Sequence, residues 1–162
     1  ATVVGTFGAL ERIDALVNNA ALLIPRQIAE MTAEEWDQQL GAGLRGAFLC
    51  SREAFRRMRD GGSIVNVSSL SGVPGAEKFP GMAAYVAAKS GLAGLTEALA
   101  VEGRPLGIRV NAVSPGAIDT PMLKLSGVAG RKFEPAQVAR IVAWLATPDS
   151  APLTGANLRL EP

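Results

Sequence analysis

The sequence predicts an α/β fold in which a mostly parallel sheet is covered by helices on both faces. Two observations carry this prediction. Four short apolar segments, two of them rich in β-branched residues, alternate with three longer segments of helical periodicity. Glycine (18 residues) and proline (10 residues) are spread between these segments as turn residues. Such alternation is typical of right-handed βαβ crossovers, which build parallel sheets in three layers.

The expected strands are short. They are residues Asp14–Asn18, Ser63–Val67, Ile108–Val113 and Ala156–Leu160. The middle two are bounded by Gly or Pro, as buried strands are. The last contains Arg159, which favours a position at the edge of the sheet.

The first expected helix covers about Ala33–Met58 and begins with a capping box, Thr32 to Glu35. Glycines 41, 43 and 46 lie inside it, and each costs about 1 kcal/mol relative to Ala. They need a packing or functional reason, or the helix is kinked. Further helices are expected at about Met82–Glu102, which is apolar nearly all round, and at Pro135–Thr147.

Composition excludes several classes of function. The 162 residues contain no histidine, which excludes His-based triads and His metal sites. Cys50 is the only cysteine, so an internal disulfide and a thiolate metal cluster are excluded, and no metal site is expected. The net charge of +1 provides no strongly basic field, so a nucleic-acid partner is not expected. No apolar run is long enough to span a membrane, and the chain begins at Ala1 without the pattern of a signal peptide.

In open parallel sheets, ligands bind beyond the carboxyl ends of the strands. Here those ends lead into Asn19-Ala20-Ala21, Ser68-Ser69 and Ser114-Pro115-Gly116. Small residues in the first loop would let a flat ligand approach the backbone. Beyond Pro115-Gly116, Thr120 could donate to a ligand carbonyl. Each stretch could equally be a plain turn at the end of a strand.

Tyr85 and Lys89 are four residues apart, so they share one face of the expected helix. An ammonium about 4 Å from a phenolate contributes roughly 1–4 kcal/mol, which would lower the phenol pKa toward neutrality. Such a tyrosine could exchange a proton without any histidine. The alternative is an ordinary surface tyrosine beside a lysine whose head reaches solvent. Ser69 could hydrogen-bond a substrate oxygen, or could simply cap a turn.

In their order these stretches resemble the short-chain dehydrogenase/reductase family. The matching residues are Ile13–Ala20 (IDALVNNA), Gly62–Ser69 (GSIVNVSS), Tyr85–Lys89 (YVAAK), Ile108–Gly116 (IRVNAVSPG) and Thr120-Pro121. The resemblance implies a Rossmann-like sheet. It also implies an oxidoreductase that transfers a hydride between NAD or NADP and a carbonyl or alcohol substrate.

The resemblance also implies a role for each matched residue. Tyr85 would be the acid/base, Lys89 would lower its pKa and bind the nicotinamide ribose, and Ser69 would hold the reacting oxygen. The residues along the cofactor would be Asn19, Ala20, Ala21, Pro115, Gly116, Ile118 and Thr120. An apolar substrate pocket is expected from Leu70, Val73, Phe79, Met122 and Leu123.

Several features depart from the family pattern. No glycine-rich phosphate loop precedes Ile13, and Gly5–Gly8 reads instead as the end of a helix. We therefore expect the carboxyl two-thirds of one NAD(P)-binding domain, with NAD and NADP both open. Gly43 stands where the family usually has an Asn, and the Asn-Asn-Ala-Gly loop ends in Ala21. Ser69 and Tyr85 are three residues farther apart than usual, which suggests an insertion at 76–79. The tail 158–162 lacks the family's acidic-Gly-Gly ending.

Two other functions stay open. One is a truncated or decayed remnant that does not bind cofactor, and the other is elimination chemistry on the same fold, against which Lys89 argues. The family commonly pairs its two long helices into a four-helix interface, so a homodimer or homotetramer is expected. We also expect a cytoplasmic location.

Overall fold

The computed structural model describes residues 10–162. Its sheet contains four parallel strands in the order β1-β2-β3-β4, with bounds Ala15–Asn18, Gly62–Val67, Ile108–Pro115 and Asn157–Leu160. This confirms the predicted parallel sheet, with strand ends shifted by one or two residues. The helix end expected at Gly5–Gly8 lies outside the described residues.

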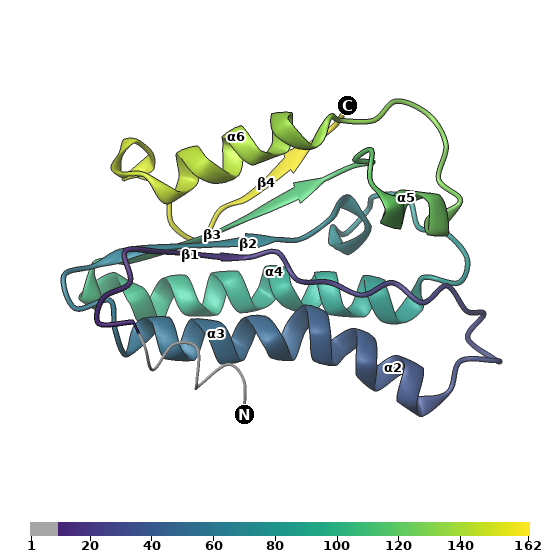
Figure 1. The fold of residues 1–162 in the computed structure, drawn as a ribbon, viewed down its shortest axis with the longest axis horizontal. Coiled ribbons are helices and arrows are strands. Elements are labelled where there is room, and N and C mark those ends of the chain that lie inside the picture. Colours follow the sequence, from purple (N-terminus) through teal and green to yellow (C-terminus); the bar gives the residue numbers. More distant parts are fainter. Residues whose placement is uncertain (1–9) are drawn as a thin grey trace.

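Helices cover both faces of the sheet (Figure 1). On one face lie α2 (Ala33–Leu40), a π-helical segment at Gly41–Arg45, α3 (Gly46–Phe55) and α4 (Ala83–Gly103). On the other face lies α6 (Pro135–Ala146), while the short α5 (Pro121–Ser126) follows β3. Three short 3-10 turns, at Leu70–Gly72, Arg104–Leu106 and Pro148–Ser150, complete the described elements.

The first long helix differs from its prediction in two ways. It is interrupted by a π-helical turn, Gly41–Arg45, which contains Gly41 and Gly43 and ends just before Gly46. It also ends at Phe55, not Met58, because the backbone turns there and Met58 enters the core with 3% of its surface exposed. The predicted capping box is confirmed, since Thr32 Oγ1 accepts from the Glu35 amide and Glu35 Oε2 accepts from the Thr32 amide.

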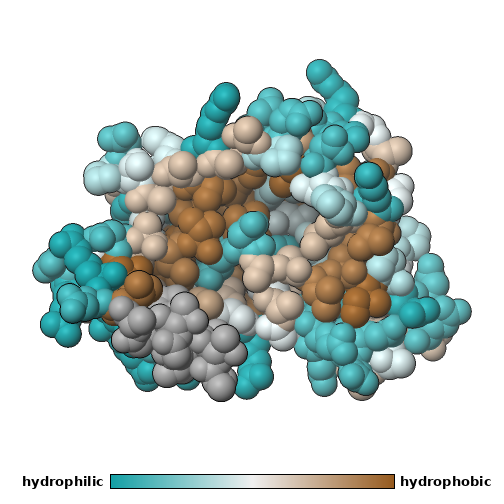
Figure 2. Space-filling model, in the orientation of Figure 1, coloured by the Kyte–Doolittle hydropathy of each residue, from teal (hydrophilic) through white to brown (hydrophobic). Residues whose placement is uncertain are grey.

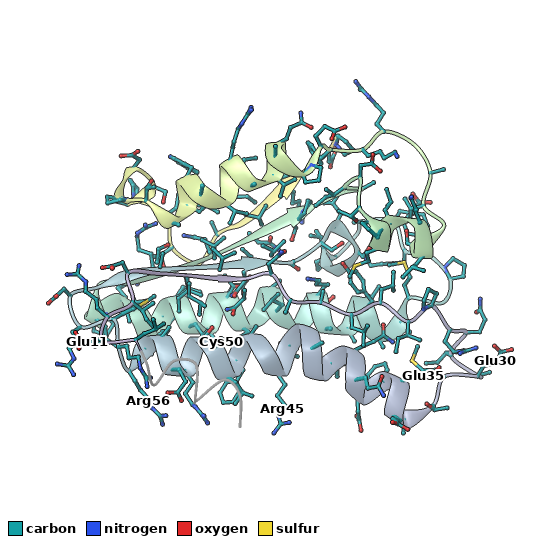
Figure 3. The ribbon with its side chains drawn as sticks, viewed as in Figure 1. Glu11, Glu30, Glu35, Arg45, Cys50 and Arg56 are labelled. Atoms are coloured by element: carbon teal, nitrogen blue, oxygen red, sulfur yellow. The ribbon has the colours of Figure 1, made fainter. Side chains whose placement is uncertain are left out.

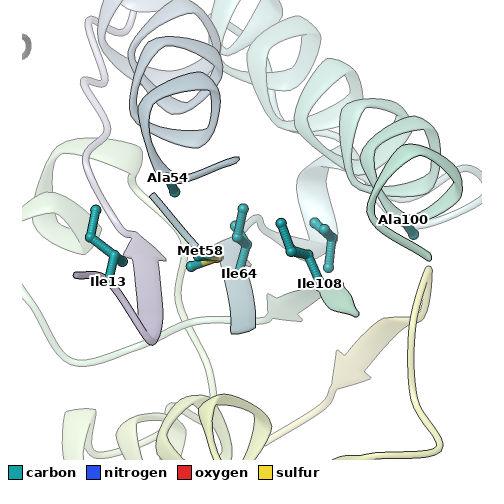
Figure 4. Packing of buried hydrophobic residues seen from close by; sticks show 7 residues of the cluster. Ile13, Ala54, Met58, Ile64, Ala100 and Ile108 are labelled. Carbon is teal, nitrogen blue, oxygen red and sulfur yellow. The ribbon is translucent and has the colours of Figure 1, made fainter. Parts of the chain in front are cut away.

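Two apolar clusters hold the layers together. Between the sheet and α3/α4, buried residues include Ile13, Met58, Ile64 and Ile108 (Figure 4). Between the sheet and α6, Val65, Val113, Val138 and Leu145 pack together. Because β2 and β3 contribute to both clusters, their carboxyl ends are held rigidly where ligands are expected.

The two sheet edges are β1 and β4, and β1 is the more exposed. Val17 in β1 keeps 44% of its surface exposed. On the face of the molecule seen in Figure 2, apolar surface lies over the region where Figure 1 places β1 and α6. Trp144 of α6 is also 41% exposed. The helices of residues 10–162 include none that is long and apolar enough to cross a membrane.

Candidate active site

A cavity of about 540 Å³ opens at the carboxyl ends of β1, β2 and β3. This volume falls in the range of small-molecule sites. The predicted residues that line it are Asn19, Ala21, Ser69, Tyr85, Lys89, Pro115, Gly116, Ile118 and Thr120. Among the predicted catalytic and cofactor-binding residues, Ala20 alone does not line it, and Ala20 is exposed.

The amino-terminal half of α4 is pressed against the turn that follows β2. A Cβ added at Gly72 would lie 2.6 Å from the Lys89 carbonyl carbon, so only glycine allows this approach. Ser68 Oγ donates to the Lys89 carbonyl at 2.9 Å, and Ser90 Oγ donates to the Gly72 carbonyl at 3.0 Å. These contacts fix the position of α4 relative to Ser69.

Lys89 is buried, with 3% of its surface exposed. Its Nζ donates to the main-chain carbonyl of Val67 at 2.6 Å. No acidic side chain pairs with it among residues 10–162. Burial disfavours the charged form and lowers the pKa of Lys89 to about 8. A buried, unpaired lysine in an otherwise apolar helix is a candidate functional group.

Tyr85 lies beside Lys89, whose Nζ is 5.7 Å from the centre of the phenol ring. The predicted lowering of the Tyr85 pKa is wrong for this structure. Burial raises the pKa of the phenol, and only the nearby Ser69 side chain opposes that shift. Tyr85 is therefore a protonated phenol at neutral pH, suited to donate a proton.

The structure confirms that Ser69 caps a turn, and it places the same residue on the cavity wall. Its Oγ accepts from the Ser71 amide at 3.1 Å, so it caps the Leu70–Gly72 turn. It also lines the cavity and affects the ionisation of Tyr85. The cap fixes the hydroxyl on the same side of the cavity as the phenol.

A chain of buried amides supports the cavity floor. Asn18 Nδ2 donates to Asn66 Oδ1 at 2.8 Å, and Asn66 Nδ2 donates to Thr96 Oγ1 at 2.9 Å. The two asparagines are register partners on β1 and β2. Asn18 Nδ2 also lies 3.1 Å from Ser51 Oγ, which ties the loop at Asn19 to α3. This confirms that amide side chains fix the first loop.

The loop after β3 forms the opposite wall. Gly116 N donates to the Leu160 carbonyl at 2.9 Å, which extends β3 beyond its predicted end. A Cβ at Gly116 would lie 3.3 Å from the Leu70 side chain, so the wall is narrow there. Thr120 begins α5, and its Oγ1 donates to the Ile118 carbonyl at 3.3 Å rather than remaining free.

The expected substrate side is mostly confirmed. Leu70, Phe79, Met122 and Leu123 line the cavity, but Val73 does not, because it packs into the interior with 2% exposed. The sequence also predicts that residues from about 72 to 82 and those after Pro121 line this side, and Glu77, Met82, Val128 and Arg131 do so. Leu23 is a lining residue that no sequence pattern predicted.

Charged residues elsewhere lie apart from this cavity. Glu11, Glu30, Arg45 and Arg56, labelled in Figure 3, are exposed and lie on or near α2 and α3. Cys50 comes from α3 and does not line the cavity. Residues 10–162 contain no group of His, Cys, Asp or Glu side chains that could hold a metal ion.

Gly43 lies in the π-helical turn against α4. A Cβ there would lie 3.4 Å from the Ala88 Cβ, so a small side chain fits with slight adjustment. Ala88 precedes Lys89, whose ammonium is held by the Val67 carbonyl. Position 43 therefore adjoins the helix that carries Lys89, although this chain has no side chain there.

Comparison with known proteins decides the family. A sequence model described as enoyl-(acyl carrier protein) reductase matches residues 1–161. A crystal structure of a short chain dehydrogenase from Mycobacterium smegmatis is 34% identical with a TM-score of 0.82, over 99% of this chain and 63% of that chain. The chain belongs to the short-chain dehydrogenase/reductase family. Its sheet is a Rossmann-like fragment of that fold.

Relatives within the short-chain dehydrogenase/reductase family carry varied names. Trans-4-hydroxycyclohexanecarboxylate dehydrogenase of Sinomonas cyclohexanicum is 37% identical over 92% of this chain and 59% of its own length. Acetoacetyl-CoA reductase of Rhizobium meliloti is 39% identical over 90% of this chain and 65% of its own. A Serratia marcescens family structure has a TM-score of 0.84 and 34% identity, covering 98% of this chain and 68% of that chain. The chain thus spans less than two-thirds of these curated relatives.

Proposed function

We propose that the protein is an oxidoreductase that transfers a hydride between NAD(P) and a carbonyl or alcohol, with Tyr85 as acid/base. The observation that carries this proposal is the meeting of Ser69, Tyr85 and Lys89 in one cavity without histidine. A protonated phenol beside a buried cation and a hydroxyl is a proton donor for a carbonyl oxygen.

In the direction of reduction, the bound nucleotide supplies the hydride to the carbonyl carbon and is itself oxidised. The Tyr85 O–H bond breaks as the proton passes to the carbonyl oxygen, which becomes a hydroxyl. Ser69 Oγ donates a hydrogen bond to the same oxygen as negative charge grows there. Lys89 stabilises the phenolate that remains, because its ammonium carries the nearest positive charge.

The cavity fits a nicotinamide nucleotide. An ammonium has three donors, and within residues 10–162 Lys89 uses only the one directed at Val67. The remaining donors would bind ribose hydroxyls. The small residues Ala21 and Gly116 leave room for a flat ring, and we assign Asn19, Pro115, Ile118 and Thr120 to the same nucleotide. Both NAD and NADP suit these residues.

We infer that these 162 residues correspond to the carboxyl two-thirds of one NAD(P)-binding domain. The share of the relatives that they cover supports this. The apolar wall of Leu70, Phe79, Met122 and Leu123 favours a small apolar carbonyl or alcohol as substrate. A cytoplasmic location is part of the same proposal.

A second copy of the chain is the partner that we propose. A groove on the outer face of α2, the π-helical turn, α3 and α4 is lined mostly by apolar and small residues, together with the charged Asp37 and Arg45. The apolar and small residues are Leu40, Gly41, Leu44, Phe48, Gly91, Gly94, Leu95 and Ala98. Phe48 keeps 43% of its surface exposed there. Small residues let helices approach closely, which suits a dimer or tetramer. A monomer by light scattering would contradict this part of the proposal.

The deciding experiment is a titration of the full-length protein with NADH and with NADPH, followed by fluorescence, and then by assay with a cyclic ketone. Saturable binding of one nucleotide with ketone reduction is expected. A folded protein that binds neither nucleotide would overturn the proposal and favour the non-catalytic remnant. Nucleotide binding without any redox turnover would favour elimination chemistry.

A further inference from the structure

The loop at residues 73–82, between the Leu70–Gly72 turn and α4, forms one wall of the cavity. It consists of two Pro-Gly turns, Pro74-Gly75 and Pro80-Gly81. Gly75 and Gly81 have backbone φ values of +79° and +78°, which residues other than glycine rarely adopt. The loop contains residues 76–79, where the long spacing between Ser69 and Tyr85 suggests an insertion.

Both ends of this loop are anchored. The Val73 amide donates to the Leu70 carbonyl at 2.9 Å, and Val73 is buried. At the other end the Arg26 amide donates to the Gly81 carbonyl at 2.9 Å, and Met82 is buried. The ends cannot move without breaking these contacts.

The middle of the loop depends on one side chain. In the described part of the chain, residues 77–79 make no backbone hydrogen bond. The Lys78 ammonium donates to the Val73 carbonyl at 2.7 Å and to the Ala76 carbonyl at 2.9 Å. The Lys78 side chain therefore links the middle of the loop to the turn at the start of the loop. Its neighbours Glu77 and Phe79 line the cavity.

Resting on the proposed function, we propose that Lys78 is a positioning residue that holds Phe79 as a fixed wall and thereby limits the substrate to compact apolar carbonyl compounds. The loop would otherwise be free to swing, because it has no secondary structure at residues 77–79. A fixed wall favours a ring that fills the cavity and excludes a larger one. The bonds of Lys78 are partly exposed to water, so its effect is moderate.

The test compares Lys78→Met, Lys78→Arg and the matched control Lys124→Met in the full-length protein. Lys124 is exposed on α5 and makes no hydrogen bond among residues 10–162. Each variant is assayed with cyclohexanone and with the bicyclic ketone 1-decalone. Hydrogen–deuterium exchange of peptides covering residues 73–82 is measured in parallel.

For Lys78→Met we expect faster exchange in the 73–82 peptides alone. The preference for cyclohexanone over 1-decalone, as a ratio of kcat/KM, should fall about threefold to tenfold. The change should lie in KM, with kcat for cyclohexanone and the KM for nucleotide unaltered. Lys78→Arg should restore most of the preference, because a guanidinium can donate to both carbonyls. Lys124→Met should match the wild type.

Unchanged exchange in Lys78→Met would show that the ammonium does not hold the loop and would overturn the proposal. Faster exchange with unchanged preference would overturn the role in specificity. A wild-type protein that binds no nucleotide and reduces neither ketone would overturn the proposed function and with it the substrate role. The exchange result would still decide whether Lys78 holds the loop.

Discussion

The central strands of the sheet, β2 and β3, and its edge strand β1 differ in which side chains are buried and which are exposed. On the β2–β3 side, Asn66, Ser68 and Lys89 are nearly inaccessible to water, and each makes a hydrogen bond. At the β1 edge the apolar Val17 is largely exposed. Buried polar groups are costly to leave unpaired, so those on the first side are held in one arrangement. The comparison shows that the buried polar contacts gather at the carboxyl ends of the strands, where even the edge strand β1 contributes Asn18.

The largest expected effect would test whether the polar side serves catalysis. Tyr85→Phe should lower kcat/KM for ketone reduction by about 10²–10⁴, because it removes the acid that donates the proton. The free energy of unfolding should change little, since the Tyr85 hydroxyl interacts with the Ser69 side chain at the cavity and not with the core of the fold. Steady-state kinetics and urea unfolding measure the two effects. Retained turnover would defeat the role assigned to Tyr85.

A pair of variants would sharpen the comparison in terms of stability. Asn66→Leu removes the link between Asn18 and Thr96 and takes one buried hydrogen-bond partner from each, so it should lower the free energy of unfolding by about 1–3 kcal/mol. Val17→Thr, at the open edge, should change it by less than about 0.5 kcal/mol. Urea unfolding of both variants gives the difference. Equal effects would mean that the edge is as constrained as the site.

The pH dependence follows from Lys89. Its ammonium is present below its pKa of about 8 and is lost above it, so the Kd for nucleotide should rise as pH increases from 7 to 9.5. Lys89→Met should bind weakly at every pH and show no such rise. Because burial lowers the folded-state pKa below the ordinary 10.5, the unfolded chain holds the proton between these values. The free energy of unfolding should therefore increase over that window. A pH-independent Kd in the wild type would contradict the role of Lys89.

The smallest effect is expected from Gly43→Asn. The new side chain would meet the Ala88 Cβ at 3.4 Å, which the helices can absorb, and it would stand near Lys89. Since Lys89 is already held by the Val67 carbonyl, kcat should change less than about threefold. Gly43→Ala is the matched control for the added volume. An increase of tenfold or more in Gly43→Asn alone would show that a side-chain donor is needed at this position.

Most of the fold follows from local patterns. Apolar runs and helical periodicity predicted all four strands and the three principal helices, because these signals reflect burial that the chain cannot avoid. The same patterns missed the π-helical turn and the end of α3 at Phe55. Both depend on how the glycines and Met58 pack against other elements, which no local pattern records.

For the site, the sequence by itself determined which candidate residues gather and at which edge of the sheet, since the carboxyl ends of parallel strands meet there. Only the tertiary structure decided their electrostatics. The four-residue spacing of Tyr85 and Lys89 suggested a lowered pKa for the phenol. In the structure, burial raises the pKa of Tyr85, and the Lys89 ammonium donates a hydrogen bond to the Val67 carbonyl. The tertiary structure also decided that Val73 is buried in the core and that the Lys78 ammonium donates to carbonyls of its own loop. Burial and hydrogen-bond partners come from residues that folding brings together.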